Sequence, residues 1–270
     1  MAKIESSYFD ISYLDTLSYQ DTSIHRVDPR AKLLATLVFI VTVVSFNKYE
    51  ITGLIPFMIF PIVLIAVGNL PPVYLFKKLI LAAPFAFFIG IFNPIFDRET
   101  LMHIGPLNIS GGWVSFVSIL LRFVLTVSAA LILVASTGFN GVCMALEKTG
   151  TPKGFAVQLL FLYRYIFVLI EEASRIARAR SLRALGTRGM GMRVFGSMTG
   201  QLLLRTIDRG QRIHQAMLCR GFDGDIRLVR RLRIGWRDTV FLAGWSALFV
   251  LMRIYNVPHA LGNLVMRILG

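Results

Sequence analysis

The chain has 270 residues, of which 55% are hydrophobic and only 16% are charged. This composition excludes an ordinary soluble domain and indicates a polytopic membrane protein. Lysine and arginine together number 29 against 15 acidic residues, which gives a formal net charge of +14. Because the long apolar segments argue against nucleic acid as a partner, the basic charge points to anionic lipid or to an acidic protein surface.

The basic charge is concentrated in one stretch. Between Phe139 and Arg237 the sequence has eighteen basic and six acidic residues, so this stretch carries +12 of the net +14. The two cysteines, Cys143 and Cys219, form no CxxC pair, and the four histidines lie far apart in the sequence. We therefore expect neither a disulfide framework nor a metal site in this chain.

Five segments are predicted to span the membrane, because about 20 apolar residues cross a bilayer as a helix. They cover residues 30–46, 51–70, 79–96, 113–139 and 239–257. Asp28 followed by Pro29 is typical of a helix N-cap and first helical position, and it predicts where the first span begins. Residues 97–112 are predicted to form a polar loop.

Basic residues mark alternate loops, which predicts the orientation of the chain. They precede the first span (Arg26, Arg30, Lys32), separate the second from the third (Lys77, Lys78) and fill the stretch between the fourth and fifth. The positive-inside rule then places the N-terminus and the arginine-rich stretch in the cytoplasm. Residues 154–170 could form a sixth span, but that would move the arginines outside. We interpret them as a helix packed beneath the membrane domain or obliquely into it.

Arg122 lies inside the fourth predicted span. A charge within the membrane is a candidate functional residue by default. The side chain could instead reach the outer interface or form a structural pair, and these alternatives stay open.

Two long helices are predicted in the basic stretch, at about residues 155–185 and 193–219, with a glycine-containing turn at 186–191. The first helix is apolar in its first half and basic in its second. The second has apolar residues at helical spacing, which is typical of an amphipathic helix. Helices of this kind often lie on anionic lipid, and this interpretation stays open.

Each of these helices closes on an arginine among small residues. The two motifs are Ala179-Arg180-Ser181 and Cys219-Arg220-Gly221. Small neighbours let the backbone of another protein come close, and a guanidinium group is a planar, permanently charged donor for carboxylates and carbonyls. The paired motifs therefore favour two protein-binding sites.

The predicted fold class is an all-α polytopic membrane protein with about five transmembrane helices and a cytoplasmic pair of long amphipathic helices. The predicted domains are a membrane domain at 1–140, a cytoplasmic helical region at 141–236, and a final transmembrane helix with a tail at 237–270.

Three stretches match a known family. They are His25-Arg26-Val27-Asp28-Pro29-Arg30-Ala31-Lys32, Tyr163-Arg164-Tyr165 with Glu171-Glu172, and Gln215-Ala216-Met217-Leu218-Cys219-Arg220-Gly221-Phe222-Asp223-Gly224. With them, nearly the whole chain resembles the transmembrane coupling (T) component of energy-coupling factor (ECF) transporters. It is most similar to the CbiQ type, which serves uptake of cobalt, or to its nickel counterpart.

The resemblance implies a role for the two arginine motifs. Members of the family carry two short Ala-Arg-Gly-like motifs at the ends of coupling helices, and each motif docks into a groove on one ATPase subunit. Here Ala179-Arg180-Ser181 and Cys219-Arg220-Gly221 fit best, with serine in place of glycine in the first and cysteine in place of alanine in the second. Arg178 and Arg183 leave the register of the first motif open. The candidate supporting residues are Arg183, Met217, Phe222 and Asp223.

The resemblance also implies partners. They are two ATP-binding-cassette (ABC) ATPase subunits, a substrate-binding membrane subunit of the CbiM/NikM type, a small accessory membrane subunit and membrane lipids, but no nucleic acid. The chain would be a non-catalytic subunit in the cytoplasmic (inner) membrane of a prokaryote and would hold no cofactor, since ATP is bound by the ATPases. Consistently, it has no GxxxxGK[ST] phosphate-binding loop. Cobalt, nickel and a vitamin all remain open as the cargo.

Two other classes of function stay open, a membrane-embedded enzyme and a lipid-bound scaffold. Glu171-Glu172 followed by Arg175 resembles the EExxxR motif of intramembrane CAAX-type proteases, but the arginine comes one residue early and no histidine follows at the right place. We interpret both glutamates as helix-surface carboxylates that pair with neighbouring arginines.

Overall fold

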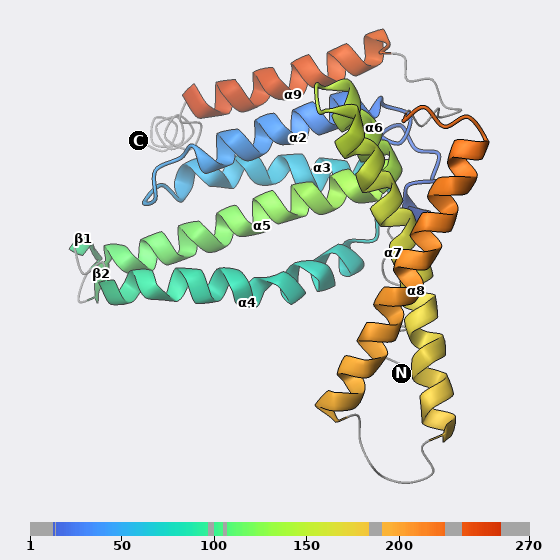
Figure 1. Ribbon diagram of the computed structural model, residues 1–270. Coiled ribbons are helices and arrows are strands. Elements are labelled where there is room, and N and C mark those ends of the chain that lie inside the picture. Colours follow the sequence, from blue (N-terminus) through green and yellow to red (C-terminus); the bar gives the residue numbers. More distant parts are fainter. Residues whose placement is uncertain are drawn as a thin grey trace. The chain divides into compact units, whose positions relative to one another are not determined.

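The computed structural model (Figure 1) describes residue 13 and residues 15–96, 100–104, 107–183, 191–224 and 234–254, with backbone only at 95, 96, 100–104 and 107–110. It divides the chain into two compact units, residues 17–138 with 232–270 and residues 1–16 with 139–231. The functional domain boundaries given above stay predictions. The predicted turn at 186–191 lies outside the described residues except for Gly191.

The unit of residues 17–138 and 232–270 is a bundle of helices with one small hairpin. Its helices are α2 (Pro29–Val44), the 3-10 helix η1 (Thr52–Met58), α3 (Ile59–Gly68), α4 (Pro72–Phe96), α5 (Gly111–Thr137) and α9 (Trp236–Ile254). Strands β1 (Thr100–Ile104) and β2 (Leu107–Ser110) pair antiparallel between α4 and α5. Helix α5 packs against α2, α3 and α4, and α2 also packs against α9.

Aromatic rings fill the centre of this bundle. The rings of Phe39 (α2), Phe57 (η1), Phe60 (α3) and Phe249 (α9) are each at most 1% exposed. The ring centroids of Phe39 and Phe60 are 4.6 Å apart, and Phe249 packs edge-on to both. Four elements thus meet at one aromatic cluster, which suits a membrane protein because close packing, rather than exclusion of water, holds helices together in lipid.

The unit of residues 1–16 and 139–231 contains α6 (Phe139–Lys148), α7 (Lys153–Arg183) and α8 (Met192–Cys219). Helix α7 packs against both α6 and α8, and the rings of Phe139 and Tyr163 stack with centroids 4.4 Å apart. Helix α8 has no fully buried residue among those described. Its half-buried positions include Met198, Leu202 and Thr206, which recur every fourth residue and so form one stripe along the helix.

Three helices in the described part are long and apolar enough to cross a membrane, at residues 72–94, 111–137 and 153–183. Residues 52–68 form a shorter apolar segment. The predicted all-α polytopic membrane fold is thereby confirmed. The exact number of spans stays a prediction, because the 16 residues of α2 cover only about 24 Å of a hydrocarbon core about 30 Å thick.

The structure differs from the prediction in the loop before α5 and at the end of α5. The predicted loop at 97–112 contains the β1–β2 hairpin, whose signal in the sequence is two short strand-like runs on either side of Gly105-Pro106. The fourth span was predicted to run to residue 139, but α5 ends at Thr137 because Gly138 adopts a left-handed φ of 72° and donates its N–H to the carbonyl of Val134. A separate helix, α6, then begins at Phe139.

Candidate functional site

The two long helices are joined by an ion pair. The Nη1 atom of Arg205 in α8 lies 2.5 Å from Oε1 of Glu172 in α7. The side chain of Glu172 is only 21% exposed, so this carboxylate is partly shielded from water where the helices meet. Neighbouring Glu171 pairs with Arg175 one turn later in α7, also at 2.5 Å. Both glutamates are therefore helix-surface partners of arginines, as predicted, rather than a free catalytic pair.

Helix α8 ends in a Schellman motif at the second arginine motif. The N–H of Phe222 donates to the carbonyl of Met217, and the N–H of Gly221 donates to that of Leu218, each at 3.0 Å. Gly221 has a φ of 78°, a left-handed conformation that glycine adopts without steric cost. The glycine in Cys219-Arg220-Gly221 thus ends the helix, and Arg220 occupies its C-cap with an exposed side chain.

The first arginine motif has a different local geometry. Ala179, Arg180 and Ser181 lie inside α7, which continues to Arg183, and the Ser181 hydroxyl donates to the carbonyl of Arg178 at 2.8 Å. Serine therefore occupies a helical position here and does not end the helix. The six predicted coupling residues are all exposed; of the supporting residues, Arg183 and Asp223 are exposed, whereas Met217 and Phe222 are half-buried.

Asp28 and Pro29 form a capped start of α2. Asp28 Oδ1 accepts a hydrogen bond from the N–H of Arg30 at 2.9 Å, and Pro29 is the first helical residue. Both features were predicted. The N–H of Asp28 donates in turn to Oδ1 of Asp238 at the start of α9, at 2.8 Å. Asp238 was not among the predicted functional residues, although an acidic residue in the first turn of an apolar segment is a helix-start signal.

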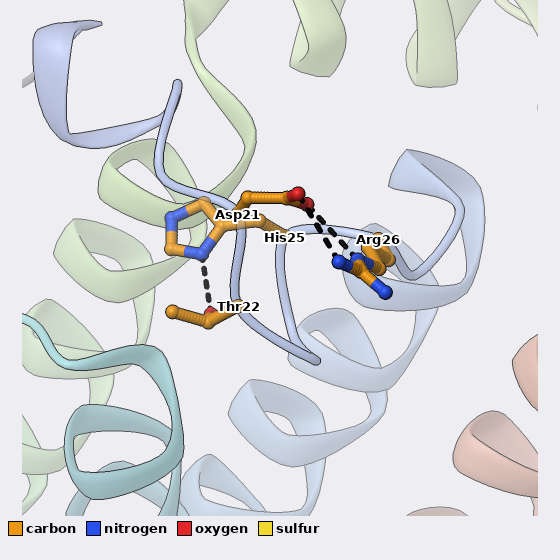
Figure 2. A network of polar contacts seen from close by, with 4 residues as sticks. All are labelled: Asp21, Thr22, His25 and Arg26. Carbon is orange, nitrogen blue, oxygen red and sulfur yellow. Dashed lines mark hydrogen bonds and ion pairs between the residues drawn. The ribbon is translucent and has the colours of Figure 1, made fainter.

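The turn that precedes α2 is held by short-range polar contacts (Figure 2). The Nδ1 atom of His25 lies 2.7 Å from the hydroxyl of Thr22. Arg26 donates from Nε and Nη2 to the two carboxylate oxygens of Asp21, at 2.9 and 3.1 Å. These bonds to Arg26 lower the pKa of Asp21. His25 is thus part of a hydrogen-bonded turn before α2.

Burial changes the protonation of His25. Desolvation lowers the pKa of its imidazole, and the nearby charge of Lys32 lowers it further, while the carbonyls of Leu17 and Ala135 act in the opposite direction without outweighing them. Lys32 itself is 5% exposed, and its Nζ donates to the carbonyl of Ser136 at 2.9 Å. This ammonium satisfies a carbonyl in the last turn of α5, where a cation also complements the helix dipole. Lys32 therefore caps the C-terminal end of α5 inside the bundle and is not a basic residue of an exposed loop.

Two arginines hold the turn between α2 and η1. Arg122 of α5 donates to the carbonyl of Asn47, and Arg253 of α9 donates to the carbonyl of Ser45 at 3.1 Å. The Arg253 guanidinium also lies 4.3 Å from the centroid of the Phe46 ring. Of the three interpretations of Arg122, the structure supports the structural pair, because backbone carbonyls at a chain reversal have no helical partner.

Metal-binding and thiol groups are sparse in the described part of the chain. No group of three or more histidine, cysteine or acidic residues there could hold a metal ion. Cys143 is buried in α6, and burial raises the pKa of its thiol to about 11, which keeps it protonated and unreactive. Cys219 is exposed beside Arg220.

A family model for cobalt transport proteins, CbiQ, matches residues 20–230, which include the capped start of α2 and both arginine motifs. The chain belongs to the CbiQ family. An uncharacterized protein of Methanocaldococcus jannaschii is 28% identical to this CbiQ-family chain over 229 residues, covering 81% of the chain and 78% of the relative. The cobalt transport protein CbiQ of Salmonella typhimurium is 26% identical over 160 residues, covering 55% and 71%.

A third relative widens the group beyond proteins named for cobalt. The energy-coupling factor transporter transmembrane protein EcfT of Macrococcus caseolyticus is 23% identical to the CbiQ-family chain over 237 residues, covering 81% of the chain and 88% of the relative. The chain is accordingly a T component of ECF transporters, of the CbiQ type, and a multi-pass membrane protein. Members of the family are membrane components of transporters, which argues against an enzyme.

Proposed function

We propose that this chain couples two ABC ATPase subunits to a substrate-binding membrane subunit and so transmits ATP-driven movement to the uptake of a metal ion. The observation that carries the proposal is that two long, packed helices each present an exposed arginine at the C-terminal end, Arg180 in the last turn of α7 and Arg220 at the C-cap of α8. Two such ends on one polypeptide match a motor made of two ATPase subunits.

The two ends are suited to protein docking by their chemistry. Arg220 projects from a helix end that is fixed by the Schellman hydrogen bonds, so its fork of N–H donors is presented by a rigid backbone. Cys219 and Gly221 add little bulk beside it, which leaves room for a partner's groove. Ala179 and Ser181 do the same for Arg180, with Arg183 and Asp223 as further charged groups at the helix ends.

The crossing of α7 and α8 would carry movement between the partners. Because Glu172 and Arg205 bond across the two helices, a displacement of one helix end transfers to the other helix instead of being absorbed by bending. In this proposal the bundle of residues 17–138 and 232–270 stays in the cytoplasmic membrane, with the N-terminus in the cytoplasm, and receives the substrate-binding subunit. The charge alternation of the loops supports that orientation.

Cobalt is the proposed cargo, with nickel or a vitamin as the alternative. Support comes from the cobalt transport family and from the Salmonella relative named for cobalt transport. The ion would be bound by the substrate-binding subunit of the CbiM/NikM type, and ATP by the ATPases, so this chain would hold neither.

Co-purification tests the proposal. The tagged chain, expressed with its genomic neighbours, should bring down an ABC ATPase, and Arg220→Ala should weaken that association, because truncating a buried, hydrogen-bonded charge at an interface costs on the order of 2–5 kcal/mol. Arg220→Lys should restore it only in part, since an ammonium group lacks the planar fork. Arg193→Ala, an exposed arginine at the other end of α8, is the matched control. A wild-type chain that never brings down an ATPase would refute the proposal.

A further inference from the structure

A cleft of about 430 Å³ lies between α7 and α8. Helix α7 contributes Tyr165, Val168, Leu169 and Glu172, which are spaced i, i+3, i+4 and i+7 and therefore form one face of the helix. The cleft is thus a defined groove along one face of α7, closed at the Glu172 end by the ion pair with α8.

The α8 wall of this cleft is basic. It contains Arg205, Arg209 and Arg212, again at i, i+4 and i+7. Arg205 is neutralised by Glu172. Across the described ranges, Arg209 and Arg212 have no acidic partner. The cleft therefore offers two unneutralised guanidinium groups to an anion.

The rest of the lining is apolar. Val168 and Leu169 from α7 and Ile213 from α8 are half-buried and face the same space. A small inorganic anion would leave these side chains uncovered, whereas an amphiphile would contact them with its hydrocarbon part while its charged part bonds to the arginines. The basic and apolar walls of the cleft therefore favour a ligand that has both an anionic group and a hydrocarbon part.

The position of the cleft along α7 indicates that the amphiphile is a membrane lipid. From Phe155 to Ile170 the helix has a single charged residue, Arg164, and from Glu171 onward charged residues follow closely. The cleft residues 165–172 straddle this change. The apolar half has the composition of a membrane segment. If it enters the membrane obliquely, the change lies at the depth of the lipid headgroups, where basic pockets between helices bind anionic headgroups.

We infer that this cleft binds an anionic phospholipid. Its phosphate lies between Arg209 and Arg212, and the start of an acyl chain lies against Val168, Leu169 and Ile213. A lipid in this position contacts both helices and holds α7 against α8 beside the Glu172–Arg205 pair. The coupling helices are then anchored to the bilayer surface by a bound lipid as well as by the chain itself.

Native mass spectrometry of the full chain, purified from membranes in mild detergent with its co-purifying partners, tests the inference. After exchange into phosphatidylglycerol or phosphatidylcholine of identical acyl chains, the complex should retain one phosphatidylglycerol per chain and much less phosphatidylcholine. Arg209→Gln with Arg212→Gln should lower phosphatidylglycerol retention about fivefold per arginine, and so on the order of 25-fold for the pair. Arg193→Gln, on the same helix but outside the cleft, should leave retention unchanged.

Gly210 offers a second variant that keeps every charge. It lines the cleft, and a Cβ at this position would meet no atom within 4 Å. Gly210→Leu should therefore fold, fill the space and displace the lipid while both arginines remain. Elution of each variant as a single symmetrical peak shows that it is folded.

Several results would overturn the inference. Equal retention of phosphatidylcholine, or full retention of phosphatidylglycerol by the arginine double variant or by Gly210→Leu, would exclude this site. Glycerol phosphate that competes as well as the whole lipid would show a free-anion site. Retention by the isolated chain but not by the assembled complex would show that a partner protein, not a lipid, covers the cleft.

Discussion

The carboxylate of Asp238 accepts a hydrogen bond from the backbone N–H of Asp28, which is 210 residues earlier in the chain, at 2.8 Å. The other oxygen of Asp238 accepts from the N–H of Gly235, also at 2.8 Å. The side chain of Asp28 meanwhile caps α2 through Arg30. Because Asp28 and Asp238 are 6% and 8% exposed, water cannot easily replace these bonds. One carboxylate thus fixes the start of α9 beside the start of α2.

Asp238→Ala should destabilise the bundle, because two shielded N–H groups lose their acceptor. We expect a loss on the order of 2–4 kcal/mol, and an intermediate loss for Asp238→Asn, whose amide keeps only one accepting oxygen. Thermal unfolding in detergent measures it. Asp208→Ala, an exposed aspartate of α8, should leave the melting temperature nearly unchanged. An Asp238→Ala melting temperature equal to that of the wild type would contradict this account.

The stability of the turn before α2 should depend on pH through His25. Since burial and Lys32 lower the pKa of His25 below its ordinary value of 6.5, the unfolded chain binds the proton more readily than the folded one. Stability is then complete above pH 6.5 and falls as the pH drops from there through the lowered pKa. His25→Asn should flatten this part of a plot of melting temperature against pH, whereas His214→Asn, at an exposed position, should not. A slope that survives His25→Asn would assign it to another group.

The ion pair between the two long helices should matter more than the one within α7. Glu171 and Arg175 lie in one helix and are 61% and 68% exposed, so water screens their coupling and it should contribute little. Glu172 is 21% exposed and joins two helices. Arg205→Ala should therefore reduce transport clearly, while Arg175→Ala changes it little. The exchange Glu172→Arg with Arg205→Glu should restore part of the loss, and unchanged uptake in Arg205→Ala would rule out a role for this crossing.

Local signals in the sequence predicted the ends of helices well. Asp28-Pro29 marked the start of α2, and the predicted end of the second long helix at about residue 219 agrees with the end of α8, because caps act within a few positions of the chain. The pairing of Glu171 with Arg175 followed from helical spacing alone. The register of the arginine motifs and their partners came from a resemblance and stays a prediction.

Contacts between distant parts of the chain were not predictable in this way. Nothing near Asp238 shows that it bonds to Asp28, and nothing near Lys32 shows that it caps α5, since both depend on how helices pack. Lys32 was counted with the basic loop residues because the sequence cannot distinguish a buried lysine from an exposed one. The partner of Arg122, the Asn47 carbonyl, is a backbone group that carries no sequence signal at all.

Gly221→Ala should distort the end of α8 and weaken the second arginine motif. An alanine at a φ of 78° costs roughly 1–2 kcal/mol, and relaxing that strain would break the bonds that fix Arg220. Gly200→Ala, inside α8 with open space around its Cβ, should instead stabilise the helix slightly. We expect weaker ATPase co-purification for Gly221→Ala alone. Equal co-purification of the two variants would show that the helix end need not be rigid.

Arg180 and Arg220 should act as a pair and not as a sum. If each engages one ATPase subunit, loss of one leaves an assembly held by the other, and the remaining attachments form at a high effective concentration. Arg180→Ala or Arg220→Ala alone should therefore keep some assembled complex and still reduce uptake sharply, because transport needs both helix ends to move together. The double substitution should abolish assembly by more than the product of the two single effects.

This cycle has to be measured on assembly and on metal uptake separately, since a coupling defect can exist with intact binding. Arg183→Ala and Arg178→Ala are the controls for the first motif, because both arginines lie within one turn of Arg180 in α7. Unchanged uptake in Arg180→Ala together with a loss in Arg183→Ala would move the motif to Arg183. That outcome fits a helix in which no glycine fixes the register, unlike α8, where Gly221 places Arg220 at the cap.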